Sequence, residues 1–249
     1  TKRTRAPRPA REKPSFRAIA AMVTVRVEDP NALSKAYEAA LELDATIPPC
    51  EELRAALREA SEADVPLMSL SLRGVPIGKL GAKALAAVLQ RDSFITFANL
   101  EDTGLGDDGA LAVAESLRTH PTLFRLDLGY NGIGGKGVKA IANLLLDSPS
   151  LLCLDMSGNN LYNRISIVAP ASLSALAPLG KAVASARCKL QLLHLDHADL
   201  EHKGLSALVD GLLTNETVVN LRLGENALEL KAAQVCSPRL FSLGLVRSH

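Results

Sequence analysis

The feature that most constrains this 249-residue chain is one cassette of apolar residues that recurs six times. The apolar residue after the strand-like run of each copy marks the spacing, and these residues are Ile77, Leu105, Ile133, Leu161, Leu200 and Leu228. Successive marks are 28, 28, 28, 39 and 28 residues apart. A fixed period of this size is typical of a solenoid, in which each unit buries its apolar face against its neighbours. The sequence therefore predicts one elongated body.

The third copy shows what each cassette contains. Apolar and polar residues alternate through Leu126 and Leu128, which predicts a short, half-buried strand. Val138, Ile141 and Leu144 then follow at spacings of three residues, which predicts one face of a helix. The other copies repeat the strand pair as Leu70/Leu72, Ala98/Leu100, Leu154/Met156, Leu193/Leu195 and Leu221/Leu223.

Two polar or small residues recur at fixed places in the cassette. Asn131 follows the strand, where we expect its amide to bond backbone groups that the turn leaves unpaired. Gly137 opens the helix, where a missing side chain would allow close packing on the neighbouring copy. The Asn recurs as Asn159 and Asn226 and is replaced by Val75, Thr103 and Ala198; the Gly recurs as Gly81, Gly109 and Gly204.

This order of strand, Asn, Gly and helix, over about residues 67–236, resembles the leucine-rich repeat of the ribonuclease-inhibitor type. The resemblance implies an α/β fold, a right-handed leucine-rich-repeat solenoid or horseshoe. Parallel strands would line its concave face and helices its convex face.

We divide the chain into a basic, Pro-containing N-terminal arm (1–29), a degenerate N-terminal capping repeat (30–66), six repeats (67–236) and a C-terminal tail (237–249). The long interval places an insertion at about 162–178, rich in Ala, Ser and Pro. Insertions in a solenoid map to loops at the margin of the stack. This one is either a tolerated surface loop or a projection for a particular partner.

The two ends of the repeat array should differ from its middle. Leu41–Thr46 imitates the strand and turn of a repeat, and Cys50–Ala60 predicts an amphipathic helix. After Leu228 the last helical pattern breaks at Ser237-Pro238. The strand Val218–Leu223 would then present an unpaired edge, so either a partner covers it or the natural protein continues, which we favour.

Charge is unevenly distributed. Residues 1–17 hold seven basic residues against Glu12, and the remainder of the chain holds 21 basic and 26 acidic residues. Such arms often bind acidic surfaces: nucleic acid, anionic lipid or an acidic protein lattice such as tubulin. A transit peptide has a similar composition and is the alternative. The candidate arm residues are Lys2, Arg3, Arg5, Arg8, Arg11, Lys13 and Arg17.

Several classes of protein are disfavoured by the sequence. No apolar run approaches 18 residues, so we expect no membrane span. Four cysteines are scattered without close pairs, which argues against zinc and for reduced thiols inside the cell; they are Cys50, Cys153, Cys188 and Cys236. Asn215-Glu-Thr217 fits a glycosylation acceptor, which we interpret as a chance match.

Side chains between the strand leucines should point into the concave face. There they would form a polar surface, acidic in its middle repeats, that fits a basic partner; the alternative is a solvated sheet without a ligand. The candidate partner-binding residues are Arg73, Phe97, Asn99, Glu101, Arg125, Asp127, Tyr130, Asp155, His194, Asp196 and Arg222.

Catalytic and metal-binding patterns are weak. His194-Leu-Asp196-His197 would bring three candidate ligands together, but no fourth ligand has a defined position. Gly132–Gly137 lacks the residue order of a phosphate-binding loop. We interpret Asp107-Asp108 as an acidic pair that favours the dipole of its own helix and nothing more. We expect no enzyme, no metal and no cofactor.

The sequence predicts a non-catalytic protein–protein interaction scaffold. Its Ala-rich, short array resembles subunits of ciliary axonemal complexes, which implies a structural role in a large cytoplasmic or cytoskeletal assembly. One alternative is a regulator of a small GTPase, because the GTPase-activating proteins of Ran use this repeat type, although their acidic tail is missing here. The other is an RNA-associated subunit that binds through the arm.

Overall fold

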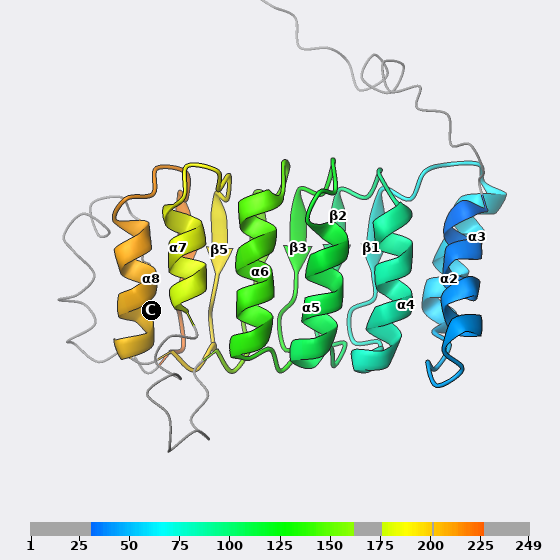
Figure 1. Ribbon diagram of the computed structural model, residues 1–249, viewed down its shortest axis with the longest axis horizontal. Helices are drawn as coiled ribbons and strands as arrows, with labels where there is room; N and C mark the ends of the chain where they lie inside the picture. The colour runs from blue at the N-terminus through cyan, green and yellow to red at the C-terminus, as the bar shows by residue number, and fades with distance from the viewer. Residues whose placement is uncertain (1–30, 162–175, 201, 227–249) are drawn as a thin grey trace, which may run out of the picture.

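The computed structural model describes residues 31–161, 176–200 and 202–226 of the chain. Six short strands form one parallel sheet in chain order, and helices connect them (Figure 1). The strands are β1 Ser69–Ser71, β2 Phe97–Asn99, β3 Arg125–Asp127, β4 Cys153–Asp155, β5 Leu192–His194 and β6 Asn220–Arg222. The helices are α2 Ala32–Leu43, α3 Glu51–Glu62, α4 Gly78–Arg91, α5 Gly106–Leu117, α6 Gly135–Asp147, α7 Ala177–Ala184 and α8 His202–Leu212.

The strand register follows the sequence period. Leu70, Ala98, Leu126, Leu154, Leu193 and Leu221 are successive partners across the sheet. Helices α4 to α8 stand side by side in a single layer that covers one face of the sheet (Figure 1). This arrangement confirms the predicted α/β solenoid, with strands on the concave face and helices on the convex face.

The core lies between the two layers. Leu126 and Leu128 from the strand region and Val138, Ile141 and Leu144 from helix α6 are fully buried. Burial of one such side chain contributes about 1.5–3 kcal/mol. Core residues of neighbouring repeats form one continuous cluster, so each repeat depends on the next for its burial.

A ladder of asparagine side chains joins the repeats. Asn131 Oδ1 accepts from the backbone N–H of Leu105 at 3.2 Å, and its Nδ2 donates to the carbonyl oxygen of Leu100 at 2.6 Å. Asn159 and Asn226 make the equivalent bonds to their own preceding repeats. The structural role predicted for this asparagine is therefore confirmed.

The asparagine is missing at two junctions: Thr103 holds its position between β1 and β2, and Ala198 holds it between β4 and β5. Ala198 has no side-chain amide to bond to the preceding repeat. The backbone N–H of Leu161 bonds instead to the carbonyl oxygen of Ala198 at 3.2 Å. This junction also contains the shortest helix of the described repeats, α7, with 8 residues.

Close packing at Gly137 is confirmed. A Cβ placed there would lie 2.9 Å from Asp107 Oδ1 and 3.3 Å from Ala110 Cβ, both in the preceding repeat. The interpretation of Asp107 was incomplete, because its Oδ1 accepts from the backbone N–H groups of Gly134 at 2.7 Å and Gly137 at 2.8 Å. Asp107 therefore caps the N-terminus of α6 in the next repeat, beyond any effect on its own helix.

At the N-terminal end, the strand-like interpretation of Leu41–Thr46 is wrong. Residues Leu41–Leu43 are the last turn of α2, and Leu43 is 90% exposed. Helix α2 instead buries Ala36 and Tyr37, earlier in its sequence, and packs against α4. The predicted second helix is confirmed as α3, and the assignment of 30–66 as a capping unit stays a prediction.

Several predictions lie outside the described residues: the arm (1–29), most of the insertion (162–175) and the tail (237–249). The last two residues of the predicted insertion belong to α7, where Pro178 sits in the first turn, a position that suits proline. None of the helices in the described part of the chain is long and apolar enough to cross a membrane.

Candidate functional site

Three rows of side chains cross the concave face. The second row, at the carboxyl end of each strand, is Ser71, Asn99, Asp127, Asp155, His194 and Arg222, paired in that order. The first row lies two residues earlier and the third row two residues later. The structure thus brings together, across six strands, the strand residues that the sequence singled out.

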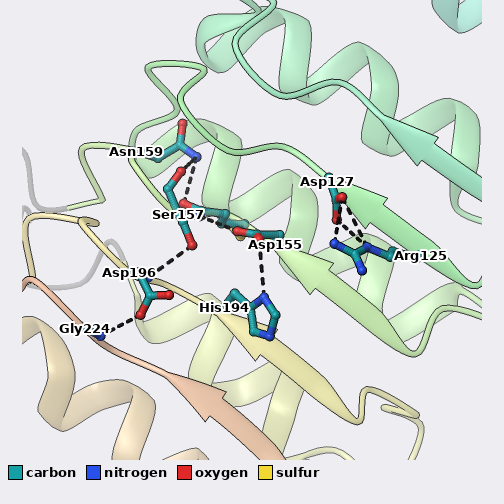
Figure 2. A network of polar contacts seen from close by, with 9 residues as sticks. Arg125, Asp127, Asp155, Ser157, Asn159, His194, Asp196 and Gly224 are labelled. Carbon is teal, nitrogen blue, oxygen red and sulfur yellow. Dashed lines mark hydrogen bonds and ion pairs between the residues drawn. The ribbon is translucent and has the colours of Figure 1, made fainter. Parts of the chain in front are cut away.

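Arg125 and Asp127 form the best-defined pair on this face (Figure 2). The Arg125 Nε and Nη2 atoms each lie 2.9 Å from a different Asp127 carboxylate oxygen. The hydrogen bonds to Asp127 raise the pKa of Arg125, although partial burial opposes them. The Arg125 guanidinium also lies 5.4 Å from the centroid of the Phe97 ring, within the range of a cation–π contact. Asp127 is therefore neutralised on its own strand.

A second network joins β4 and β5. His194 Nδ1 lies 3.3 Å from Asp155 Oδ2, and Asp155 Oδ1 accepts from the Ser157 N–H at 2.9 Å (Figure 2). Burial alone would raise the pKa of Asp155. The hydrogen bonds from His194 and from the backbone and hydroxyl of Ser157 outweigh it and lower this pKa below its ordinary value of 3.8.

This network contains Ser, His and Asp, but in the wrong order for nucleophilic catalysis. The Ser157 hydroxyl accepts from the Asp196 N–H at 3.2 Å, and the Ser157 backbone N–H bonds to Asp155. In a catalytic triad the serine hydroxyl bonds to histidine, which removes its proton, and the carboxylate lies behind the histidine. Here the imidazole faces the Asp155 carboxylate and the hydroxyl bonds to the Asp196 backbone, so the contacts join β4 to β5 and order the surface.

The candidate metal ligands do not converge. Asp196 Oδ1 accepts a hydrogen bond from the Gly224 N–H at 2.6 Å, so this oxygen bonds to the backbone just after β6 (Figure 2). His197 is exposed in the following turn, with φ of 50°. Among the residues with described positions, no group of three His, Cys, Asp or Glu side chains could hold a metal ion.

The acidic character expected for the middle repeats is largely offset by these pairings. Glu101 lies 3.0 Å from Arg73, as Asp127 lies beside Arg125. Asn99 is half-buried and accepts from the Glu101 N–H at 3.0 Å, so it too supports the strand end. Asp155 and Asp196 remain as carboxylates without an arginine or lysine within ion-pair distance among the described residues.

Tyr130 extends the surface to the rim of the sheet. It lies in the turn after β3, half exposed, with φ of 54°. A Cβ placed on Gly158 would overlap the Tyr130 ring, so glycine at that position leaves room for the ring to lie over the next repeat. The arm residues predicted to bind a partner lie outside the described residues.

An exposed apolar band was missed by the sequence reasoning. Each strand, or the residue just before it, contributes one exposed or half-buried apolar side chain: Met68, Phe97, Phe124, Leu152, Leu192 and Val219. The available signal was a pair of consecutive apolar residues before a strand, such as Leu123-Phe124 and Val218-Val219, because such pairs break the alternation.

The three cysteines in the described part of the chain form no disulfide. Cys50, Cys153 and Cys188 are free thiols, and burial raises the pKa of each. Asn215, in the possible glycosylation acceptor, uses both ends of its amide: Nδ2 donates to the Val183 carbonyl oxygen at 2.7 Å, and Oδ1 accepts from the Val218 N–H at 2.7 Å. This asparagine has a structural role in the turn before β6.

Comparison with known proteins gives two similarities. A family model described as "Leucine Rich repeat" matches residues 119–142, which span β3 and the first half of α6. Among solved structures, that of "Leiomodin-1 Actin-Binding Site 2 (ABS2)" is similar, with 20% sequence identity and a TM-score of 0.47 over 79% of this chain and 90% of that chain. No curated protein sequence matches this chain.

Proposed function

We propose that this leucine-rich-repeat protein is a non-catalytic scaffold that holds other proteins against the concave face of its sheet. The main observation in support is the strand register. Six strands present their outward side chains in aligned rows, and asparagine side chains that bond to the preceding repeat maintain the alignment. The period of 28 residues and the helices of 12–14 residues in α4, α5 and α6 support a repeat of the ribonuclease-inhibitor type.

The finer assignment is to a structural subunit of a large cytoplasmic assembly, such as a ciliary axonemal complex of the cytoskeleton. It rests on the resemblance of the Ala-rich array. The arm from Lys2 to Arg17 would then contact an acidic surface such as tubulin by charge attraction. The carboxylates on the concave face already bond to neighbouring side chains or backbone groups. This supports a role in holding a partner protein rather than in catalysis.

Two alternatives predict different measurements. A regulator of a small GTPase would change the rate of GTP hydrolysis, whereas a scaffold leaves that rate unchanged. An RNA-associated subunit would retain RNA with a steep dependence on salt concentration, and would lose this retention when residues 1–17 are deleted.

Cross-linking mass spectrometry of the full chain in native extract tests the proposal. We expect cross-links from stable partners to residues around β1 to β6. Arg222→Glu changes an exposed side chain on β6, and Arg91→Glu makes the same change at the exposed end of α4. The first variant should weaken these contacts and the second should not. Partners that contact neither the sheet, the insertion nor the arm would contradict the proposal.

A further inference from the structure

The apolar band defined above runs along the amino ends of the strands, from Met68 at β1 to Val219 at β6. Met68 and Phe124 are each 48% exposed, and Val219 is 64% exposed. Single exposed apolar residues are ordinary on a protein surface, but a contiguous series marks an interaction site. Here every strand of the sheet contributes one member.

A repeated bulge in the hydrogen bonding places Phe124 and Leu152 on the outer face, whereas Phe97 and Leu192 belong to the first row. The backbone N–H groups of Phe124 and Arg125 both bond to the Thr96 carbonyl oxygen, at 2.8 and 3.0 Å. The N–H groups of Leu152 and Cys153 share the Phe124 carbonyl oxygen in the same way. Two consecutive residues therefore face one partner residue, and the alternation of inward and outward side chains is suspended at this point.

The charged residues near the band lie along only one of its two borders. The only charged residue in the first row or in the row just before it is Arg125, which Asp127 already pairs. On the side of the second and third rows, the band is bordered by the carboxylates of Asp155 and Asp196 at β4 and β5 and by the exposed Arg222 at β6. An occupant would thus meet apolar surface along its centre and, beside β4 and β5, negative charge along one border.

The distance between neighbouring strands indicates which secondary structure an occupant of the band would have. Parallel strands lie about 4.8 Å apart, so five steps from β1 to β6 span about 24 Å. An α-helix repeats its apolar stripe every turn, at about 5.4 Å, and covers about 24 Å with about 16 residues. In an extended segment, side chains on one face recur at about 6.6 Å, which matches the strand spacing less well.

We infer that the apolar band binds an amphipathic α-helix of another protein, which lies across the six strands. Its apolar stripe packs on Met68, Phe124, Leu152 and Val219, and lysine or arginine residues along one border face Asp155 and Asp196. This inference rests on the proposed scaffold function and names the class of partner.

A designed peptide of about 16 residues tests the inference directly, with leucines at helical spacing and lysines along one border. Its scrambled form has the same composition without the stripe. We expect the full-length protein to bind the designed peptide at least about 10-fold more tightly than the scrambled one, by isothermal titration calorimetry, because only the stripe buries apolar surface.

Three variants make the test specific. Phe124→Gln and Leu111→Gln each replace an exposed apolar side chain, on the band and on helix α5 respectively. We expect about a 10-fold loss of affinity for the first and no change for the second, with equal melting temperatures showing that both fold. Asp196→Asn keeps an oxygen for the Gly224 N–H and removes the charge, so it should weaken only peptides with the lysine border.

Four outcomes would overturn the inference: equal binding of the scrambled peptide, no effect of Phe124→Gln, tighter binding of a proline-rich extended peptide, or a dimer of this chain that Phe124→Gln dissociates. The scaffold proposal is judged separately by cross-linking. If Arg222→Glu removes partners that Phe124→Gln retains, the band inference fails and the scaffold function stands. If neither variant alters any partner contact, the scaffold function fails.

Discussion

One side chain in most repeats accepts a hydrogen bond from the turn that leads into the strand. Each acceptor lies near the end of a helix and bonds to the backbone N–H three residues later, at 2.7–3.2 Å. The acceptors are Asp92, His120, Ser148 and Asn215. Four residue types perform one task, so a period based on residue identity does not reveal it.

His120 shows how this position also joins repeats. Its Nδ1 accepts from the Leu123 N–H, so that nitrogen carries no proton, and the proton on Nε2 points to Asp92 Oδ1 at 3.1 Å. Both side chains are 1% exposed. The hydrogen-bonding roles of the two ring nitrogens of His120 are therefore set by Leu123 and Asp92.

The asparagine ladder yields a first prediction. Asn131→Ala leaves the buried backbone N–H groups of Leu105 and Thr103 without their partner, which costs about 1–3 kcal/mol for each group. We expect a loss of about 3 kcal/mol in the free energy of unfolding, measured by urea denaturation. Asn99→Ala, which removes one half-buried bond, should cost about 1 kcal/mol. Equal losses would contradict a special role for the ladder.

Asp155 yields a prediction about pH. Its pKa is lower in the folded protein than the ordinary 3.8, so its ionised form stabilises the fold above that value. This contribution disappears as pH falls through the folded pKa. The difference in unfolding free energy between the unaltered protein and Asp155→Asn should therefore be constant from pH 7 to about pH 5 and shrink below about pH 4. A difference that grows on acidification would contradict this account.

At the scale of elements, helices α7 and α8 approach each other through glycine. A Cβ placed on Gly211 would overlap the carbonyl oxygen of Gly180, which is backbone and cannot turn aside. At Gly81 the nearest obstacle is a methyl carbon of the Ile77 side chain, 2.8 Å away. The two glycines therefore differ in what surrounds them, although both lie on the inner side of a helix.

These two glycines give a matched pair of variants. Gly211→Ala should force the helices apart and lower the unfolding free energy by about 1–3 kcal/mol, since overpacking strains both elements. Gly81→Ala should cost less, because a side-chain methyl group 2.8 Å away yields more readily than a backbone carbonyl oxygen 2.0 Å away. Calorimetric melting of both variants decides the comparison, and a larger loss at Gly81 would refute it.

The elements also show what the sequence could and could not predict. The strand leucines and the Asn and Gly positions were predictable because the period repeats residue types in register. Leu41 and Leu43 gave a wrong strand prediction, because two leucines two residues apart occur in helices as well as in strands. The concave rows followed from alternation, but the apolar band did not, because the shared Thr96 and Phe124 carbonyls arise only when strands pair.

At the scale of the whole molecule, stability passes from repeat to repeat through nearest neighbours. The junction between β4 and β5 has a short α7 and lacks the asparagine bridge at Ala198. Other junctions within the central array, such as that between β3 and β4, keep the bridge through Asn159. Local opening should therefore begin where the bridge is missing.

Hydrogen exchange provides the measurement for this prediction. The Met156 N–H bonds to β5 across the weak junction, and the Leu128 N–H makes the corresponding bond from β3 to β4. We expect the Met156 amide to exchange at least about 10-fold faster under native conditions, because its opening needs less free energy. Equal protection of the two amides would mean that the array opens as one unit.

The constant register has a consequence for how such a protein changes over evolutionary time. A tandem duplication of any 28 consecutive residues within 70–154 would supply each new strand, asparagine and helix cap with a partner at the offset it already uses. The sheet would lengthen by about 4.8 Å and gain one more position in each row. Duplications of other lengths would shift these offsets, so lineages of this chain should differ in size by whole units.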